Sequence, residues 1–232
     1  MPFSTEFDHS FSQVAHYKLY PELYPWVGEH YAAQSTKILV LGESHYLEPE
    51  STYHLDAAAW YLGVDMSQRP DRTHILTRNI IRNGIRNGWR SGSKLIYRNI
   101  EAALTEAGVK APNGQTPIST IAFYNYFQRP AEKTGQSIRV TDIDRTHSAA
   151  TLISVLGILK PDLVLFCSKH AWRAAKSYEI AQYASDNNIR LVTTVHPSTS
   201  WWNRKMKNYK NRTGKQVFID ELLPKAVDVV GV

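Results

Sequence analysis

Four short apolar runs, spaced far apart, constrain the fold of this chain more than any other feature. The runs are residues 37–41 (KILVL), 120–124 (TIAFY), 162–166 (DLVLF) and 190–195 (RLVTTV). Each is continuously apolar or β-branched instead of alternating, which is typical of strands that are covered on both faces in a parallel sheet. Helical patterns lie between them. The sequence therefore predicts an α/β fold, a three-layer α/β/α sandwich around a central four-stranded, mainly parallel sheet.

The segments between the runs show the apolar periodicity of helices. These segments are residues 94–108, 146–159, 170–184 and 216–230, and Pro224 is expected to kink the last one. The basic segment between the first two strands contains Gly84, Gly88 and Gly92, each of which costs about 1 kcal/mol inside a helix. Two shorter helices with a glycine-rich break are therefore expected there. No linker or low-complexity tract divides the chain, so residues 1–232 are predicted to form a single domain.

The single cysteine, Cys167, excludes an internal disulfide and an all-cysteine zinc or iron–sulfur site. A composition that is 43% hydrophobic and 21% charged excludes a disordered chain. The apolar runs, such as residues 38–41 and 163–167, are far shorter than the ~20 residues of a transmembrane helix. The first residues lack the basic and apolar regions of a secretion signal. We expect a cytoplasmic protein, most simply a monomer, with no membrane partner, no metal and no cofactor.

The net charge of +6 is concentrated in two stretches. Residues 69–98 carry eight Lys or Arg side chains and one acid, and residues 201–215 carry six and no acid. Aromatic side chains lie among these bases, namely Trp89, Trp201, Trp202 and Tyr209. Cations bind a phosphate backbone and rings stack on unpaired bases, so this pattern favours a nucleic-acid partner. A solvated basic face is the alternative interpretation.

Polar segments follow all four predicted strands. They are residues 42–46 (GESHY), 125–130 (NYFQRP), 168–170 (SKH) and 196–202 (HPSTSWW). In a sheet of parallel strands joined by helices, ligands bind outside the carboxyl ends of the strands. The sequence therefore predicts a functional site assembled from these four segments.

Taken in this order, the segments resemble motifs of the uracil-DNA glycosylase superfamily. GESHY resembles its first motif, Gly-Gln-Asp-Pro-Tyr or Gly-Glu-x-Pro-Gly, and residues 196–198 resemble its last motif, His-Pro-Ser. Residues 161–172 look like its third strand with the following helix, and NYFQRP is similar to the asparagine-bearing stretch of the iron–sulfur branch. The resemblance covers residues 36–205, although residues 50–115 match only in general character. One cysteine cannot hold the cluster of that branch, so none is expected.

The resemblance implies that the protein binds DNA, single- or double-stranded, and flips a damaged base into a pocket. Hydrolysis of the N-glycosidic bond would then remove the base, with uracil or another deaminated base expected. His196 would stabilise the negative charge on the leaving base, and Asn125 would read its Watson–Crick edge. Tyr46 would crowd the 5-position of the base, and Gly42, Ser44 and His45 would complete the pocket. Each of these residues also has a purely structural interpretation. His196 would fix the end of a strand through backbone hydrogen bonds, Asn125 would stabilise a turn or cap, and Tyr46 would pack in the core.

The first motif departs from the family pattern at two positions. Ser44 stands where the uracil-specific branch has the acid that activates water, and a serine hydroxyl is no base without a group to take its proton. Glu43 matches the glutamate of the Gly-Glu-x-Pro-Gly branch, so it is predicted to position or activate the water. His45 replaces the motif proline and adds a ring that titrates near neutral pH.

In the family, the loop after His-Pro-Ser pushes an apolar side chain into the duplex. Trp201 or Trp202 is predicted to act as this wedge or to stack on a base, and Ser198, Arg204 and Lys205 are predicted to hold phosphates. The alternative is that the two tryptophans pack a helix onto the sheet. Both interpretations can hold, with one ring in the core and the other in contact with nucleic acid.

Two other functions stay open at this point. The first is a non-catalytic or substrate-shifted nucleic-acid-binding protein of the same fold, which the departures at Ser44 and His45 permit. The second is a hydrolase of a nucleoside-like small molecule, in which the basic face contributes only to solubility.

Overall fold

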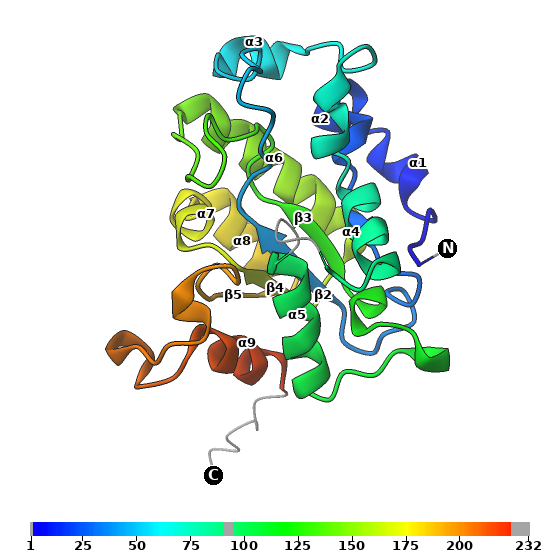
Figure 1. Ribbon diagram of the computed structural model, residues 1–232, viewed down its shortest axis with the longest axis vertical. Coiled ribbons are helices and arrows are strands. Elements are labelled where there is room, and N and C mark those ends of the chain that lie inside the picture. Colours follow the sequence, from blue (N-terminus) through cyan, green and yellow to red (C-terminus); the bar gives the residue numbers. More distant parts are fainter. Residues whose placement is uncertain (1, 91–94, 224–232) are drawn as a thin grey trace.

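The computed structural model describes residues 2–90 and 95–223 (Figure 1). One five-stranded sheet lies at the centre, in the order β1-β3-β2-β4-β5. The strands are β1 (Trp26–Val27), β2 (Ile38–Gly42), β3 (Ala122–Asn125), β4 (Leu163–Phe166) and β5 (Arg190–Thr193). Strands β2, β3, β4 and β5 run parallel, whereas β1 pairs antiparallel with β3. The prediction of an α/β fold with a mainly parallel sheet is confirmed.

The expected number of four strands is wrong, because β1 adds a fifth strand at the edge of the sheet. This strand has two residues, paired as Trp26 with Phe123 and Val27 with Ala122. A two-residue strand is too short to show a periodic pattern, so the sequence gives no signal for it. The four predicted runs correspond to β2, β3, β4 and β5, with ends shifted by no more than two residues.

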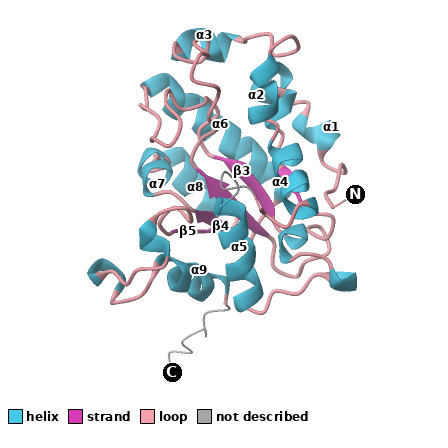
Figure 2. Cartoon of the chain, viewed as in Figure 1, coloured by secondary structure: helices cyan, strands magenta, loops and turns pink. Residues whose placement is uncertain are grey.

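Helices surround the sheet (Figure 2). They are α1 (Asp8–Phe11), α2 (Ala15–Leu19), α3 (Ala57–Leu62), α4 (Thr77–Arg86), α5 (Leu95–Glu106), α6 (Asp142–Leu159), α7 (Lys169–Ala174), α8 (Tyr178–Asp186) and α9 (Gly214–Leu222). The two shorter helices expected after the first strand are confirmed as α4 and α5, and Gly92 of the expected break lies outside the described residues. The single helix predicted over residues 170–184 is wrong, because Ser177 caps a second helix, α8, within that range. Helix α9 ends before Pro224, which is also outside the described residues.

Side chains of the central strands alternate between two buried clusters on opposite sides of the sheet. Leu39 and Leu41 of β2 belong to one cluster together with residues of α6. Ile38 and Val40 belong to the other together with residues of α5. In the view of Figure 1, α5 lies in front of the sheet and α6 behind it. Strand β5 is only half-buried along its length, so the expected cover on both faces does not extend to this edge.

No helix in the described part of the chain is long and apolar enough to cross a membrane.

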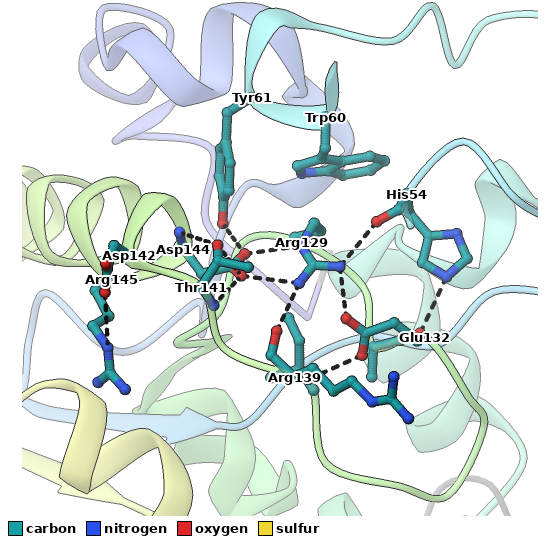
Figure 3. A network of polar contacts seen from close by, with 12 residues as sticks. His54, Trp60, Tyr61, Arg129, Glu132, Arg139, Thr141, Asp142, Asp144 and Arg145 are labelled. Atoms are coloured by element: carbon teal, nitrogen blue, oxygen red, sulfur yellow. Dashed lines mark hydrogen bonds and ion pairs between the residues drawn. The ribbon is translucent and has the colours of Figure 1, made fainter. Parts of the chain in front are cut away.

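A buried ion pair fixes the segment that follows β3 (Figure 3). Arg129 is 1% exposed, and its Nε and Nη2 atoms donate to the two carboxylate oxygens of Asp144 at 2.9 Å each. Its remaining N–H groups donate to Glu132 and to the backbone carbonyls of His54 and Arg139, each at 3.0 Å. Burial alone would raise the pKa of Asp144, but the hydrogen bonds from Arg129 and Thr141 hold this pKa below its usual value. Both partners therefore stay charged and hydrogen-bonded, which a buried ion pair needs.

This ion pair also orders the backbone beside β2. The segment after β3 donates from the N–H of Phe127 to the carbonyl of Glu43 and from the N–H of Ala131 to the carbonyl of His45, each at 2.9 Å. The two segments thus stay paired beyond the ends of their strands. Because Arg129 anchors one of them, it sets the position of the residues that follow β2.

We predict that Asp144→Asn destabilises the protein by about 3–5 kcal/mol, because the variant removes the more deeply buried of the two carboxylates that pair with the Arg129 guanidinium. Urea unfolding at pH 7 measures this change. The matched control is Asp142→Asn, two residues away on α6, whose exposed carboxylate lies 3.9 Å from Arg145. The control is expected to change stability far less. Equal effects of the two substitutions would contradict the importance of the buried pair.

Candidate active site

A cavity of about 1100 Å³ opens at the carboxyl ends of the parallel strands. Strand β2 has β3 on one side and β4 on the other, so the order of the sheet reverses at β2. A crevice forms at such a point because the connections leave the sheet in opposite directions, and ligands of α/β proteins bind there. The cavity receives residues from the ends of β2, β3 and β4 and from the segment after β5.

Most of the residues predicted for the site meet in this cavity. Those that line it are Glu43, Ser44, His45, Tyr46, Asn125, His196, Ser198 and Trp201. Gly42, Trp202, Arg204 and Lys205 are not among the lining residues. The four polar segments, separated by up to 150 residues of sequence, therefore form one site.

Gly42 allows the side chain of Asn125 to take its place in the cavity. The two residues are register partners at the ends of β2 and β3. A Cβ atom on Gly42 would lie 2.1 Å from Oδ1 of Asn125, so only glycine permits this approach. Asn125 is 8% exposed, and within the described residues its side-chain amide makes no hydrogen bond. Asn125 lines the cavity, so a ligand there meets a side-chain amide that has no hydrogen-bond partner among the described residues.

His196 is held as a neutral ring with a defined tautomer. Its Nδ1 accepts from the backbone N–H of Ser198 at 3.3 Å and lies 2.7 Å from the Ser198 hydroxyl. A backbone N–H can only donate, so Nδ1 is the acceptor and Nε2 carries the proton. Burial lowers the pKa of His196 below its usual 6.5, and the negative charge of Glu43 partly opposes this shift. The ring is therefore a neutral hydrogen-bond donor through Nε2.

The turn that carries His196 is fixed from two sides. Asn99 of α5 donates from Nδ2 to the carbonyl of Pro197 at 2.7 Å. The hydroxyl of Thr199 donates to the carbonyl of His196 at 2.9 Å. Asn99 belongs to the stretch that resembles the superfamily only in general character, so no motif marks this position.

Glu43 extends from the end of β2 toward the end of β4. Its Oε2 accepts a hydrogen bond of 2.5 Å from the hydroxyl of Ser168. Burial raises the pKa of Tyr46, and the charge of Glu43 raises it further. The same charge acts on His196. The negative charge of Glu43 thus raises the pKa values of both Tyr46 and His196.

His45 and Ser44 do not supply a base. The His45 ring is 7% exposed, and its Nε2 lies 3.1 Å from the Thr77 hydroxyl at the start of α4. Burial lowers the pKa of His45 to about 4, so the ring is neutral at pH 7. The Ser44 hydroxyl is buried and has no hydrogen-bond partner in the described structure, so no group there takes its proton. His45 therefore braces α4 against the loop after β2.

The two neighbouring tryptophans have different surroundings. Trp201 is 51% exposed at the rim of the cavity. Trp202 is 1% exposed, and its ring packs edge-on against Phe218 of α9, with 5.6 Å between the ring centroids. Trp202 is therefore a core residue, and the hypothesis that it contacts nucleic acid is corrected. Of these two rings, Trp201 is the one whose surface is available to a ligand.

The predicted basic surface is smaller than the sequence suggests. Arg72 pairs with Glu22 at 2.7 Å, and Arg78 pairs with Asp8 at 2.6 Å. Arg69 stacks its guanidinium over the ring of a tyrosine. These three cations of the 69–98 stretch hold the protein's own segments together. The exposed cations of the other stretch are Arg204, Lys205, Lys207 and Lys210, on the segment that projects at the lower left of Figure 1.

The cavity is also lined by residues that no sequence motif marks. They include Thr134, Gly135, Gln136, Ser137, Arg173, Leu95, Ile96 and Tyr97. Lys169, in the flagged SKH segment, also lines the cavity, and burial and the nearby charge of Arg173 lower its pKa. No local pattern marks these positions, because the tertiary fold alone brings them to the cavity. Among residues 2–90 and 95–223, no group of three His, Cys, Asp or Glu side chains is placed to hold a metal ion.

Comparison with models of known protein families and with curated proteins finds no match to this chain. Its function has to be inferred from the geometry of the cavity.

We predict that His196 titrates below pH 6.5 and is protonated on Nε2 at pH 7, because burial disfavours the imidazolium and Ser198 occupies Nδ1. Nitrogen NMR of the histidine rings measures both properties. Glu43→Gln should lower this pKa further, because it removes the negative charge that supports the imidazolium. Glu179→Gln, which alters an exposed carboxylate on α8, is the matched control and should leave it unchanged. A charged His196 at pH 7 would contradict the assignment.

Proposed function

We propose that this protein is an N-glycosyl hydrolase of the uracil-DNA glycosylase type, which removes uracil or another deaminated base from DNA. The observation that carries the proposal is the meeting of Glu43, Asn125 and His196, from three different strand ends, in one cavity. These groups supply a base, a reader of hydrogen-bonding edges and a neutral donor. The two buried clusters on opposite sides of the sheet support the three-layer architecture expected for such a protein.

Asn125 provides the means to recognise a base in the cavity. A carboxamide offers one acceptor and two donors in a plane, which complements the donor and acceptor on the edge of a pyrimidine. Its close approach to Gly42 fixes the amide in one place. A nearly buried amide without a protein partner gains most from a ligand that satisfies both of its ends. We propose this pairing as the step that selects the base.

Glu43 is the group suited to activate water. In the proposed reaction, a water oxygen attacks C1′ of the sugar while the C1′–N bond breaks and its electron pair passes to the base. Glu43 orients this water and accepts its proton, which then passes to the departing base or to solvent. Its negative charge also favours the positive charge that develops on the sugar as the bond breaks.

His196 is suited to stabilise the leaving base. Negative charge develops on the oxygen of the departing pyrimidine, and the Nε2–H of a neutral imidazole donates a hydrogen bond to it. The ring need not lose its proton, since a preorganised donor is sufficient. The contact of Nδ1 with Ser198 keeps the tautomer that this role requires.

The surface beside the cavity supports DNA as the carrier of the base. Trp201 stands at the rim with half of its surface exposed, where it can stack on a base or fill the space that a flipped base leaves. The exposed cations Arg204 and Lys205 follow directly, with Lys207 and Lys210 on the same projecting segment. These cations are free to contact phosphates.

We predict that the wild type excises uracil from a labelled oligonucleotide, single-stranded or paired with guanine. Glu43→Gln should slow excision by about 10²- to 10⁴-fold, as expected for loss of a general base. His196→Ala should slow it by about 10²- to 10³-fold, as expected for loss of a transition-state donor. Single-turnover product formation measures both effects. Glu179→Gln and His9→Ala, at exposed positions on α8 and α1, are the matched controls and should cleave at the wild-type rate.

Two results would replace the proposal with one of its alternatives. Salt-sensitive binding of the oligonucleotide without excision of any deaminated base would indicate a nucleic-acid-binding protein. Its affinity should then fall by about 0.9 log units per log unit of salt for each duplex phosphate contacted. Cleavage of a free nucleoside in preference to the oligonucleotide, with binding insensitive to salt, would indicate a small-molecule hydrolase.

A further inference from the structure

We infer that Ser168 is the positioning residue for Glu43: its hydroxyl donates to Oε2 of the carboxylate, fixes one rotamer and leaves Oε1 for the water. This inference rests on the proposed function of Glu43. Ser168 lies at the junction of β4 and α7, 125 residues from Glu43 in sequence, and it is 1% exposed. Among the described residues its hydroxyl makes no hydrogen bond to any other side chain, so it acts on the reaction through Glu43.

The hydrogen bonds around Ser168 determine the direction of the contact. The hydroxyl oxygen accepts from the backbone N–H groups of His170 at 3.2 Å and Ala171 at 3.1 Å. Both of these groups can only donate, so the single hydroxyl proton is left for the third partner. That partner is Oε2 of Glu43, at 2.5 Å. Ser168 is therefore the donor, and Oε2 accepts as part of a carboxylate.

The same contacts make Ser168 a stronger donor than an isolated hydroxyl. Two N–H groups point at its oxygen and polarise the O–H bond toward Glu43, since hydrogen bonds in a chain strengthen one another. A bond from a hydroxyl to a carboxylate is also charge-assisted. Because the Ser168 oxygen is itself fixed by the first turn of α7, the carboxylate is tied to β4 as well as to its own strand, β2.

The second carboxylate oxygen is the one available for chemistry. Among the described residues, Oε1 of Glu43 accepts no hydrogen bond, although Glu43 lines the cavity. A glutamate side chain has three rotatable bonds and scatters over several rotamers when nothing holds it. With Oε2 held by Ser168, Oε1 is kept in one position relative to His196 and Asn125. Orientation of a reacting group within a fraction of an ångström has a large effect on rate.

The position of the Glu43 charge can be measured without any turnover. The negative charge supports the imidazolium form of His196, so the pKa of this ring reports whether the carboxylate stays nearby. If Ser168→Ala releases Glu43 toward solvent, the pKa of His196 should fall toward the value in Glu43→Gln. Ser168→Thr keeps the hydroxyl and should hold this pKa at the wild-type value. NMR titration of the four proteins makes the comparison.

Loss of a helix cap by itself must be separated from release of Glu43. Ser177 caps α8 as Ser168 caps α7, with its hydroxyl accepting from the N–H of Ile180 at 3.4 Å, and it does not line the cavity. Ser177→Ala is therefore the matched control for the lost cap. It should leave both the His196 titration and the excision rate unchanged.

Kinetics complete the test. Ser168→Ala should lower kcat by about 10- to 100-fold with KM unchanged, because the base pocket is intact while the water is misplaced. Ser168→Thr should restore most of the rate. An unchanged His196 pKa and an unchanged kcat in Ser168→Ala would overturn the inference. If the wild type has no glycosylase activity, the proposed function fails, whereas the NMR titration still decides whether Ser168 positions Glu43.

Discussion

The ion pair between Arg129 and Asp144 is the constraint on which the site depends. Both groups are almost completely removed from water, so the structure tolerates them only as a fully hydrogen-bonded pair. The pair ties the segment after β3 to the first turn of α6 (Figure 3). Backbone donors of that segment then hold the carbonyls of Glu43 and His45. Arg129, which the sequence presents as part of a motif, thus acts as an anchor and does not line the cavity.

Contacts between strand ends, in turn, decide what each polar group can do. Asn125 reaches its place only because Gly42, its register partner, has no side chain. Glu43 is held from the end of β4 by Ser168, and the tautomer of His196 follows from the turn after β5. Each contact removes a rotamer or a protonation state that the free side chain would otherwise populate. Preorganisation of this kind is what turns common residue types into a reactive site.

The distribution of charge shows why a count of bases overstates a binding surface. In the 69–98 stretch, Arg72 and Arg78 pair with acids from the N-terminal region of the chain. Lys215 of the second stretch pairs with Glu106 of α5. Exposed cations lie on the segment after Trp201 and, in the first stretch, at Arg86, Arg90 and Arg98. A long arginine side chain binds a partner within the protein or outside it, and only the folded arrangement shows which of the two it does.

The sequence by itself determined the α/β class, the four parallel strands and the edge of the sheet where the cavity lies. These features follow from local apolar patterns and from the rule that parallel strands end at a common edge. The short strand β1, the division of residues 170–184 into two helices and the burial of Trp202 were decided by tertiary structure. So were the bracing role of His45 and the hydrogen bond from Ser168 to Glu43. The physical reason is that local patterns record which side chains avoid water, whereas partners, tautomers and rotamers depend on groups that are distant in sequence and meet only in the folded chain.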